Sequence, residues 1–180
     1  MNDSFETERL VLRPPTLDDF EDFAAMCADP EVMRYIASDG QALSRFAAWQ
    51  SLCSAVGHRS LRGYGMFAVI ERQTGSFVGR VGPWFPEGWV EFEVGWTIRS
   101  KCWGRGYATE AAKACIAYSF NELGRTHLVS LILPGNVRSI RVAEKAGERL
   151  ECETTLPHLP PETTVLQYGL HRNDWLLTQS

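Results

Sequence analysis

The segment from Glu93 to Glu110, EVGWTIRSKCWGRGYATE, constrains the fold more than any other part of the chain. Alternating apolar residues predict a strand that ends at Ile98, and the alanine-rich stretch after Gly106 predicts a helix. Between them, Gly104 and Gly106 allow backbone conformations that other residues resist and let the chain approach an anion closely. Because the first turn of a helix has unpaired N–H groups and the positive end of a dipole, this segment predicts a phosphate-binding turn.

Two familiar phosphate-binding motifs do not fit these residues. A P-loop ends in Gly-Lys-Ser/Thr, whereas this turn continues as GYA from Gly106. A dinucleotide fingerprint needs glycine or alanine where Thr109 stands, and an acidic residue at the end of the next strand, which instead ends in LPG at residues 133–135. Since a Gly-x-Gly pair is often only a turn, the assignment depends on the flanking sequence.

The remaining patterns predict one α+β (mixed α/β) domain that spans residues 1–180. Helices are expected to start at Thr16, Asp29, Gln41, Ala108 and Val137. Strands are expected over residues 7–13, 65–71, 76–84, 89–98, 127–133, 149–155 and 165–171. In the strand before the glycine turn, alternation places one set of side chains on the polar face, namely Glu91, Glu93, Gly95 and Thr97.

Composition narrows the class of protein. With 44% hydrophobic and 22% charged residues, the chain is typical of a soluble globular protein. The net charge is −4 and basic residues do not cluster, so nucleic acid is not an expected partner. No apolar run reaches membrane-spanning length, and the polar start of the chain does not resemble a signal peptide. Five scattered cysteines predict reduced thiols in a cytoplasmic protein. The expected oligomeric state is a monomer or a homodimer.

Several segments together resemble the GNAT family of N-acetyltransferases, and within it the ribosomal-protein-acetyltransferase-like branch. The acetyl-CoA loop of that family reads Arg/Gln-x-x-Gly-x-Gly/Ala, and here it is KCWGRG, with Lys101 in place of arginine or glutamine. Similar segments are TERLVLR from Thr7, EVGW from Glu93, YATEA from Tyr107 and NVRSIRVAEKAG from Asn136. They occur in the family's order along nearly the whole chain, which is more specific than the glycine pair alone.

The resemblance implies a mostly antiparallel sheet with helices on both faces, splayed where the strand ending at Ile98 leaves the strand starting at His127. Acetyl-CoA would place its pantetheine arm in this gap, against backbone groups of Trp96, Thr97 and Ile98. Asn136 would reach a pantetheine amide, or cap the helix that starts at the next residue, or both. The pyrophosphate would lie on the N–H groups of the turn, formed by Trp103, Gly104, Arg105, Gly106, Tyr107, Ala108 and Thr109.

Acetyl transfer to an amine needs a base for the nitrogen and a proton for the departing thiolate. Glu93 is the first candidate base, with Glu91 two residues away as the alternative; the two could hold a proton by mutual repulsion, or both could simply face solvent. Many relatives carry a tyrosine where this chain has Ala143, so Ser139 is the candidate proton donor. Ser139 could instead serve the helix start, with solvent protonating the thiolate.

The expected function is therefore acetyl-CoA-dependent N-acetylation of a primary amine by direct attack in a ternary complex. The acceptor is either a protein N-terminal α-amine or a small-molecule amine. The alternative is a CoA-binding sensor or scaffold without turnover, which the missing tyrosine favours. Covalent catalysis by Cys102 is disfavoured because no histidine is near it in sequence. No metal is expected, because His127, His158, His171 and Cys152 lack metal-ligand spacing.

Overall fold

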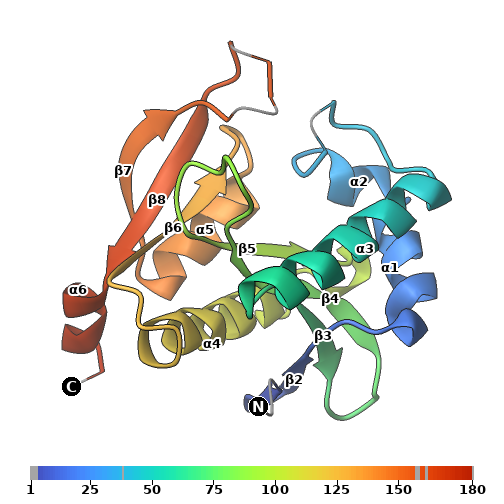
Figure 1. The fold of residues 1–180 in the computed structure, drawn as a ribbon, viewed down its shortest axis with the longest axis horizontal. Helices are drawn as coiled ribbons and strands as arrows, with labels where there is room; N and C mark the ends of the chain where they lie inside the picture. The colour runs from blue at the N-terminus through green and yellow to red at the C-terminus, as the bar shows by residue number, and fades with distance from the viewer. Residues whose placement is uncertain (1–3, 38, 157–158, 161, 180) are drawn as a thin grey trace.

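One mixed sheet organises the protein (Figure 1). The computed structural model describes residues 4–37, 39–156, 159–160 and 162–179. Within them, eight strands lie in the order β1-β2-β3-β4-β5-β6-β8-β7, antiparallel except for the β5–β6 pair. Their bounds are Phe5–Glu6 (β1), Leu10–Arg13 (β2), Phe67–Glu71 (β3), Phe77–Trp84 (β4), Glu93–Ile98 (β5), His127–Ile132 (β6), Arg149–Thr154 (β7) and Val165–His171 (β8).

Helices cover both faces of this sheet. They are α1 (Phe20–Cys27), α2 (Pro30–Met33), α3 (Arg45–Arg62), α4 (Tyr107–Asn121), α5 (Val137–Ala146) and α6 (Arg172–Leu177), with short 3₁₀ helices η1 (Leu17–Asp19) and η2 (Ser100–Cys102). In β3, the adjacent residues Ala68 and Val69 point to opposite faces. Ala68 packs in the cluster with α1 and α3, and Val69 packs in the cluster with α4. No helix in the described residues is both long and apolar enough to cross a membrane.

The alanine-rich sequence of α4 explains its position. Ala111, Ala112 and Cys115 are fully buried against the sheet, where their small side chains let the helix axis approach closely. The helix starts directly after Gly106, which has φ +80° and serves as its N-cap. The predicted glycine turn followed by a helix is therefore confirmed, and its start is fixed against the middle of the sheet.

The sheet opens between β5 and β6, and we call this opening the fork. These parallel strands have one registered pair, Glu93 with Val129, and the Val129 N–H donates to the Phe92 carbonyl at 2.9 Å. One residue further on, the Ser130 hydroxyl donates to the Val94 carbonyl at 2.8 Å, where a parallel ladder would have a backbone donor. The predicted splay is confirmed, and it leaves backbone edges of both strands facing a gap.

Some element boundaries differ from the sequence-based expectations. The third helix starts at Arg45 rather than residue 41 and runs to Arg62, because Ser44 caps it and Gly63, with φ +77°, ends it. The expected strand over residues 89–98 starts only at Glu93. The first expected strand, over residues 7–13, is shortened to β2 (Leu10–Arg13), and neither β1 nor α6 was expected. Part of the proline-rich loop, residues 157, 158 and 161, lies outside the described residues.

Candidate active site

A cavity of about 560 Å³ opens at the glycine turn. It is bounded by the turn and the start of α4, by β5, by α2 and by α5. Gly104 and Gly106 have φ values of +75° and +80°, in the region that favours glycine. No atom lies within 4 Å of the position that a Cβ of Gly104 would take, so the backbone of the turn is open to a ligand.

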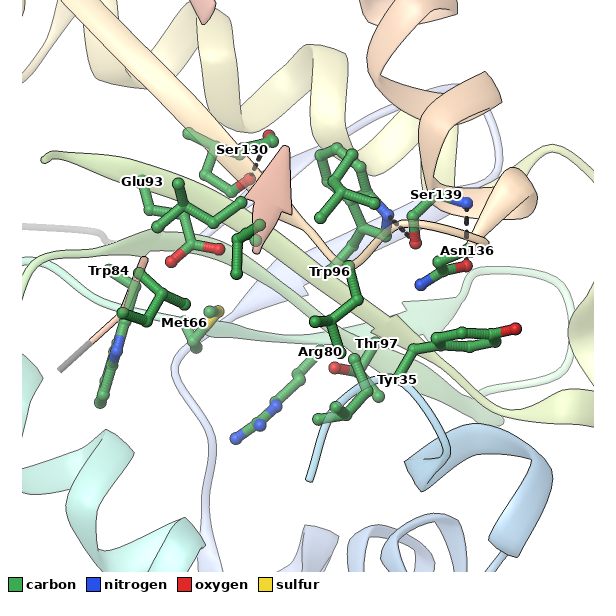
Figure 2. Close-up of a pocket in the computed structure, with 18 of the residues that line it drawn as sticks. Tyr35, Met66, Arg80, Trp84, Glu93, Trp96, Thr97, Ser130, Asn136 and Ser139 are labelled. Atoms are coloured by element: carbon green, nitrogen blue, oxygen red, sulfur yellow. Dashed lines mark hydrogen bonds between the residues drawn. The ribbon is translucent and has the colours of Figure 1, made fainter. Parts of the chain in front are cut away.

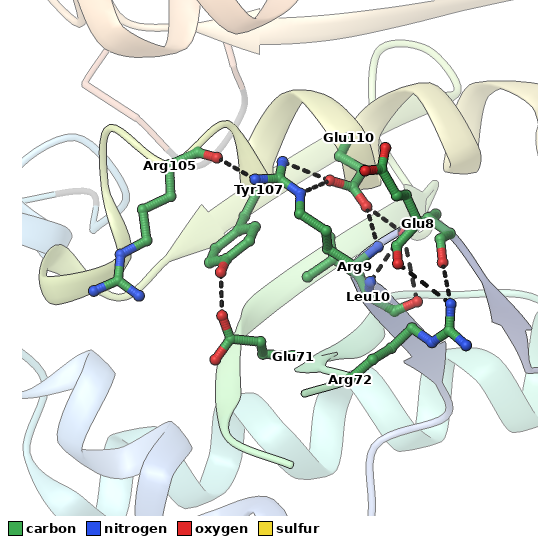
Figure 3. Close-up of polar contacts among 9 residues, drawn as sticks. Glu8, Arg9, Leu10, Glu71, Arg72, Arg105, Tyr107 and Glu110 are labelled. Carbon is green, nitrogen blue, oxygen red and sulfur yellow. Dashed lines mark hydrogen bonds and ion pairs between the residues drawn. The ribbon is translucent and has the colours of Figure 1, made fainter. Parts of the chain in front are cut away.

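The turn is held in place from the first strands of the chain (Figure 3). Arg9 donates through Nη1 to the Arg105 carbonyl at 2.8 Å and forms an ion pair with Glu110 at 2.6 Å. Glu110 also accepts from the Thr7 hydroxyl at 2.6 Å, and the Tyr107 hydroxyl donates to Glu71. The segments that start at Thr7 and Tyr107, over a hundred residues apart, are thus bonded to each other.

Basic side chains line the same cavity and were not predicted as site residues. Arg138, Arg141 and Lys145 come from α5, and Arg34 follows α2. The Arg138 guanidinium lies over the Trp103 ring, 4.1 Å from its centroid. The sequence carried a signal for the α5 group, since spacings of three and four residues place side chains on one helical face. This group is suited to phosphate oxygens.

The backbone of β5 faces two directions. Arg99 donates its N–H to the Val78 carbonyl at 2.9 Å. In the antiparallel register, every second residue before Arg99 therefore forms its backbone hydrogen bonds with β4. The register therefore directs Thr97 to β4, while Trp96 and Ile98 present their backbone groups to the fork. Thr97 itself lines the cavity, and its contact with the pantetheine arm stays a prediction. The Ile98 carbonyl accepts from the Trp103 indole at 2.8 Å.

Asn136 and Ser139 lie where the fork meets α5 (Figure 2). The Asn136 side-chain oxygen accepts the Ser139 N–H at 3.3 Å, so Asn136 does cap α5, and its NH₂ group remains a donor. The Trp96 indole donates to the Ser139 hydroxyl oxygen at 3.3 Å. Because that hydroxyl accepts from Trp96, its own hydrogen remains available for another acceptor.

A second cavity of about 280 Å³ lies on the α3 side of the sheet. Glu93, Arg80 and Trp84 line it from the sheet, and Ser51 and Ser54 line it from α3. It shares six described residues with the first cavity: Tyr35, Ile36, Trp96, Thr97, Asn136 and Ser139. The two cavities therefore meet at the fork, and Ser139 is among the residues at their junction.

Glu93 has the electrostatics of a base that works near neutral pH. Burial raises the pKa of Glu93 to about 7, although hydrogen bonds from Trp89 and the Leu131 backbone and the charge of Arg80 act to lower it. The Trp89 indole donates to Oε2 at 2.8 Å. A Cβ at Gly95 would come within 3.2 Å of Glu93 Oε1, so glycine at that position leaves room for the carboxylate.

Glu91 lies elsewhere. Its carboxylate is 44% exposed, is 4.0 Å from His127 Nδ1, and is not among the residues that line either cavity. The expectation that Glu91 and Glu93 hold a proton by mutual repulsion is wrong, because burial is the main cause of the raised pKa of Glu93 and Glu91 is not among the others.

The sequence spacing of the histidines did not reveal one cluster of potential metal ligands. His127 and His171 are cross-strand neighbours, and Glu151 lies 2.9 Å from His127 Nε2. Their potential ligand atoms all lie within 4.8 Å of one another, close enough to hold a metal ion. His158 lies outside the described residues. Cys102 lines the larger cavity, and no histidine is among the described residues around it.

Comparison with known proteins gives consistent matches. A family model described as the acetyltransferase (GNAT) domain matches residues 9–149. The uncharacterized protein YkkB of Bacillus subtilis is 37% identical over 131 residues, covering 69% of this chain and 72% of YkkB. An acetyltransferase structure from Agrobacterium tumefaciens has a TM-score of 0.82 at 30% identity, covering 94% of each chain. The fold is also that of RimL, a ribosomal L7/L12 α-N-protein acetyltransferase in complex with coenzyme A, with a TM-score of 0.74 at 14% identity over 92% of this chain and 95% of that one.

Proposed function

Because the chain belongs to the GNAT acetyltransferase family, whose members use acetyl-CoA, we propose that it acetylates a primary amine by direct attack in a ternary complex. One observation carries this proposal: the cavity at the glycine turn meets, at the fork, a second cavity that contains a carboxylate with a pKa near 7. A CoA-binding sensor would not need a base of this kind. The acceptor is a small-molecule amine or a protein N-terminal α-amine.

The residues of the larger cavity fit acetyl-CoA part by part. The N–H groups from Trp103 to Thr109 would hold the pyrophosphate, supported by the open backbone at Gly104 and by the helix dipole of α4. Arg138, Arg141 and Lys145 would neutralise further phosphate charge. The backbone of Trp96 and Ile98 and the Asn136 NH₂ group would pair with the amides of the pantetheine arm, which leads to the junction of the cavities.

Glu93 and Ser139 then divide the proton transfers. As the amine nitrogen bonds the thioester carbonyl carbon, Glu93 accepts a proton from that nitrogen and later releases it to solvent. As the C–S bond breaks, Ser139 donates its hydroxyl proton to the sulfur and regains one from solvent. Trp96 holds the Ser139 oxygen in place for this donation. The products are an amide and a free thiol, so protons and electrons balance.

Thiol release tests this proposal. Purified protein is incubated with acetyl-CoA and a panel of amines and N-terminal peptides, and free CoA is measured with a thiol reagent against a control without acceptor. Acceptor-dependent release, with a matching acetylated product by mass spectrometry, is expected. If acetyl-CoA binds by calorimetry and no acceptor accelerates release, the sensor interpretation replaces this one.

A further inference from the structure

Arg80 is a cation in an apolar setting, on the wall of the smaller cavity (Figure 2). Its guanidinium carbon lies 5.4 Å from the centroid of the Phe23 ring, and Nη1 donates to the Ser51 hydroxyl at 3.3 Å. Its Nε is shielded from solvent and has no hydrogen-bond partner. Burial lowers the pKa of Arg80, which shows that this site disfavours the charged form. An arginine placed so usually requires an anion.

No carboxylate of the described residues forms an ion pair with Arg80. Asp19, which lines a small neighbouring pocket with it, is bound by Arg13 through two hydrogen bonds of 2.6 and 2.8 Å. Asp22 pairs with Arg99 at 2.6 Å. Glu93 and Cys27 raise the pKa of Arg80 through charge interaction, without an ion pair. Within the described residues, Arg80 therefore has no carboxylate in direct contact to balance its charge.

Two hydroxyl groups that suit an anion line the cavity together with Arg80. Ser51 and Ser54 lie three residues apart on α3 and both line the cavity. Their hydroxyls can donate to an oxyanion alongside the guanidinium, whose fork of N–H groups matches carboxylate and phosphate oxygens. Trp84 and Met66 line the same cavity with largely apolar side chains.

We propose that Arg80, with Ser51 and Ser54, binds an anionic group of the amine acceptor, so that the enzyme prefers small amines that carry a carboxylate or phosphonate. This inference rests on the proposed acetyl transfer, and it assigns the substrate class of that site. Glu93 accepts the proton of the amine at one end of the cavity, and Arg80 binds the anionic group at the other.

The sheet register sets the distance between the two groups. Glu93 pairs with Trp84, and Thr97 pairs with Arg80. Four residues of strand separate these pairs, which is about 13 Å between Cα positions at roughly 3.3 Å per residue. The two side chains shorten this distance as they reach into the cavity. The preferred acceptor therefore carries its anion several bonds from its amine, as ω-amino acids do, rather than on the adjacent carbon.

A matched acceptor series tests this inference. Wild-type thiol release is measured with γ-aminobutyrate, δ-aminovalerate and ε-aminocaproate, and with butylamine, pentylamine and hexylamine as partners of equal chain length. Glycine provides the short control, and an ω-aminoalkyl phosphonate distinguishes phosphonate from carboxylate. We expect kcat/KM for the best anionic acceptor to exceed that of its alkylamine by at least about tenfold, mainly through KM.

Substitution of Arg80 then tests whether this residue causes the preference for anionic acceptors. In Arg80→Gln the ratio of the two kcat/KM values should fall about tenfold or more, and Arg80→Lys should retain part of it. The ratio cancels any change in the pKa of Glu93, because both acceptors use the same base. Arg45→Gln, on the exposed surface of α3 where Arg45 pairs with Glu21, is the matched control and should leave the ratio unchanged. Melting temperature and acetyl-CoA affinity verify that each variant is folded.

The outcomes separate this inference from the proposed function. If wild type acetylates alkylamines as well as their anionic partners, or if Arg80→Gln keeps the wild-type ratio, the inference is wrong and acetyl transfer stands. If no amine of the series is acetylated but an N-terminal peptide is, the inference is wrong and acetyl transfer stands. If acetyl-CoA binds and neither amines nor peptides are acetylated, the proposed function fails, and the inference fails with it.

Discussion

Replacing Glu93 by glutamine removes the proposed base and preserves the shape of its side chain. The amide can still accept the hydrogen bond that Trp89 now donates to Oε2 at 2.8 Å, so the cavity wall should remain in place. In the proposed binding mode acetyl-CoA lies on the other side of the fork, so its affinity should not change. General base catalysis contributes on the order of 10²–10⁴ in rate, and we expect kcat to fall within that range.

The pH dependence gives a sharper test than the loss of rate. With a pKa of about 7 for Glu93, the ionised fraction is about 9% at pH 6, half at pH 7 and about 91% at pH 8. An alkylamine acceptor with a pKa near 10 gains neutral fraction tenfold per pH unit over the same range. Below pH 7 both groups must lose a proton, so log kcat/KM should rise with slope 2 in wild type. In Glu93→Gln only the amine titrates, and the slope should be 1 throughout.

Initial rates of thiol release from pH 5.5 to 9 measure these slopes, with Glu91→Gln as the matched control. Glu91 lies two residues away outside both cavities, so its variant should keep the wild-type profile. A wild-type slope of 1 below pH 7, together with normal rates in Glu93→Gln, would refute the reasoning. Loss of activity in Glu91→Gln alone would show that the other carboxylate is the base.

Four further changes have defined outcomes. Gly106→Val requires φ +80° of a β-branched residue and should weaken acetyl-CoA binding by calorimetry; unchanged affinity with an intact fold would exclude the turn. Ser139→Ala should reduce kcat about tenfold or more, about 1.4 kcal/mol, at constant cofactor Kd, whereas normal turnover would mean that solvent protonates the thiolate. Trp89→Phe removes a donor that lowers the pKa of Glu93, so the midpoint of the pH–rate profile should rise. Glu148→Gln should raise the free energy of unfolding at pH 7 by roughly 3 kcal/mol and have little effect at pH 4, measured with urea.

The sign of the last prediction follows from burial. Glu148 is 3% exposed, and burial raises its pKa from 4.5 to about 8. A carboxyl group with a raised folded-state pKa binds its proton more tightly in the folded protein. Its contribution to stability is complete below pH 4.5 and is lost as the pH rises through 8. Glutamine stays neutral at every pH, so equal pH dependence in wild type and variant would contradict the assigned pKa.

The fold was largely predictable because its signals are local. The capping box at Thr16 and Asp19, the proline after Asp29 and the left-handed Gly147 after α5 each fix a helix end within a few residues. Errors occurred where local and tertiary preferences differ. The chain before Glu93 alternates like a strand, but β5 starts only at Glu93, where pairing with both β4 and β6 begins.

The site was predictable for residues in contiguous motifs and not for residues that meet through the sheet. Glu93, Asn136 and Ser139 are near the glycine turn or a helix start, and the structure brings them to one fork. Arg80 lies on β4 and is brought opposite Thr97 by strand register alone. The sequence around Arg80 does not reveal that it has no ion pair with a described carboxylate, because that depends on which arginines the nearby acids bind.

The hydrogens at the fork show how such non-local contacts support the site. Ser130 lies 2.8 Å from the Val94 carbonyl and 3.0 Å from Glu148 Oε1, yet its hydroxyl has one hydrogen. Both contacts are satisfied only when a protonated Glu148 donates to Ser130 and Ser130 donates to Val94, which agrees with the raised pKa of Glu148. A neutral carboxyl group on one side of the sheet thus fixes β5 one residue after Glu93, where the strands part. Ionising Glu148 would leave Ser130 with two acceptors and one hydrogen, so the geometry of the fork should loosen as the pH rises through about 8, where Glu93 is already ionised.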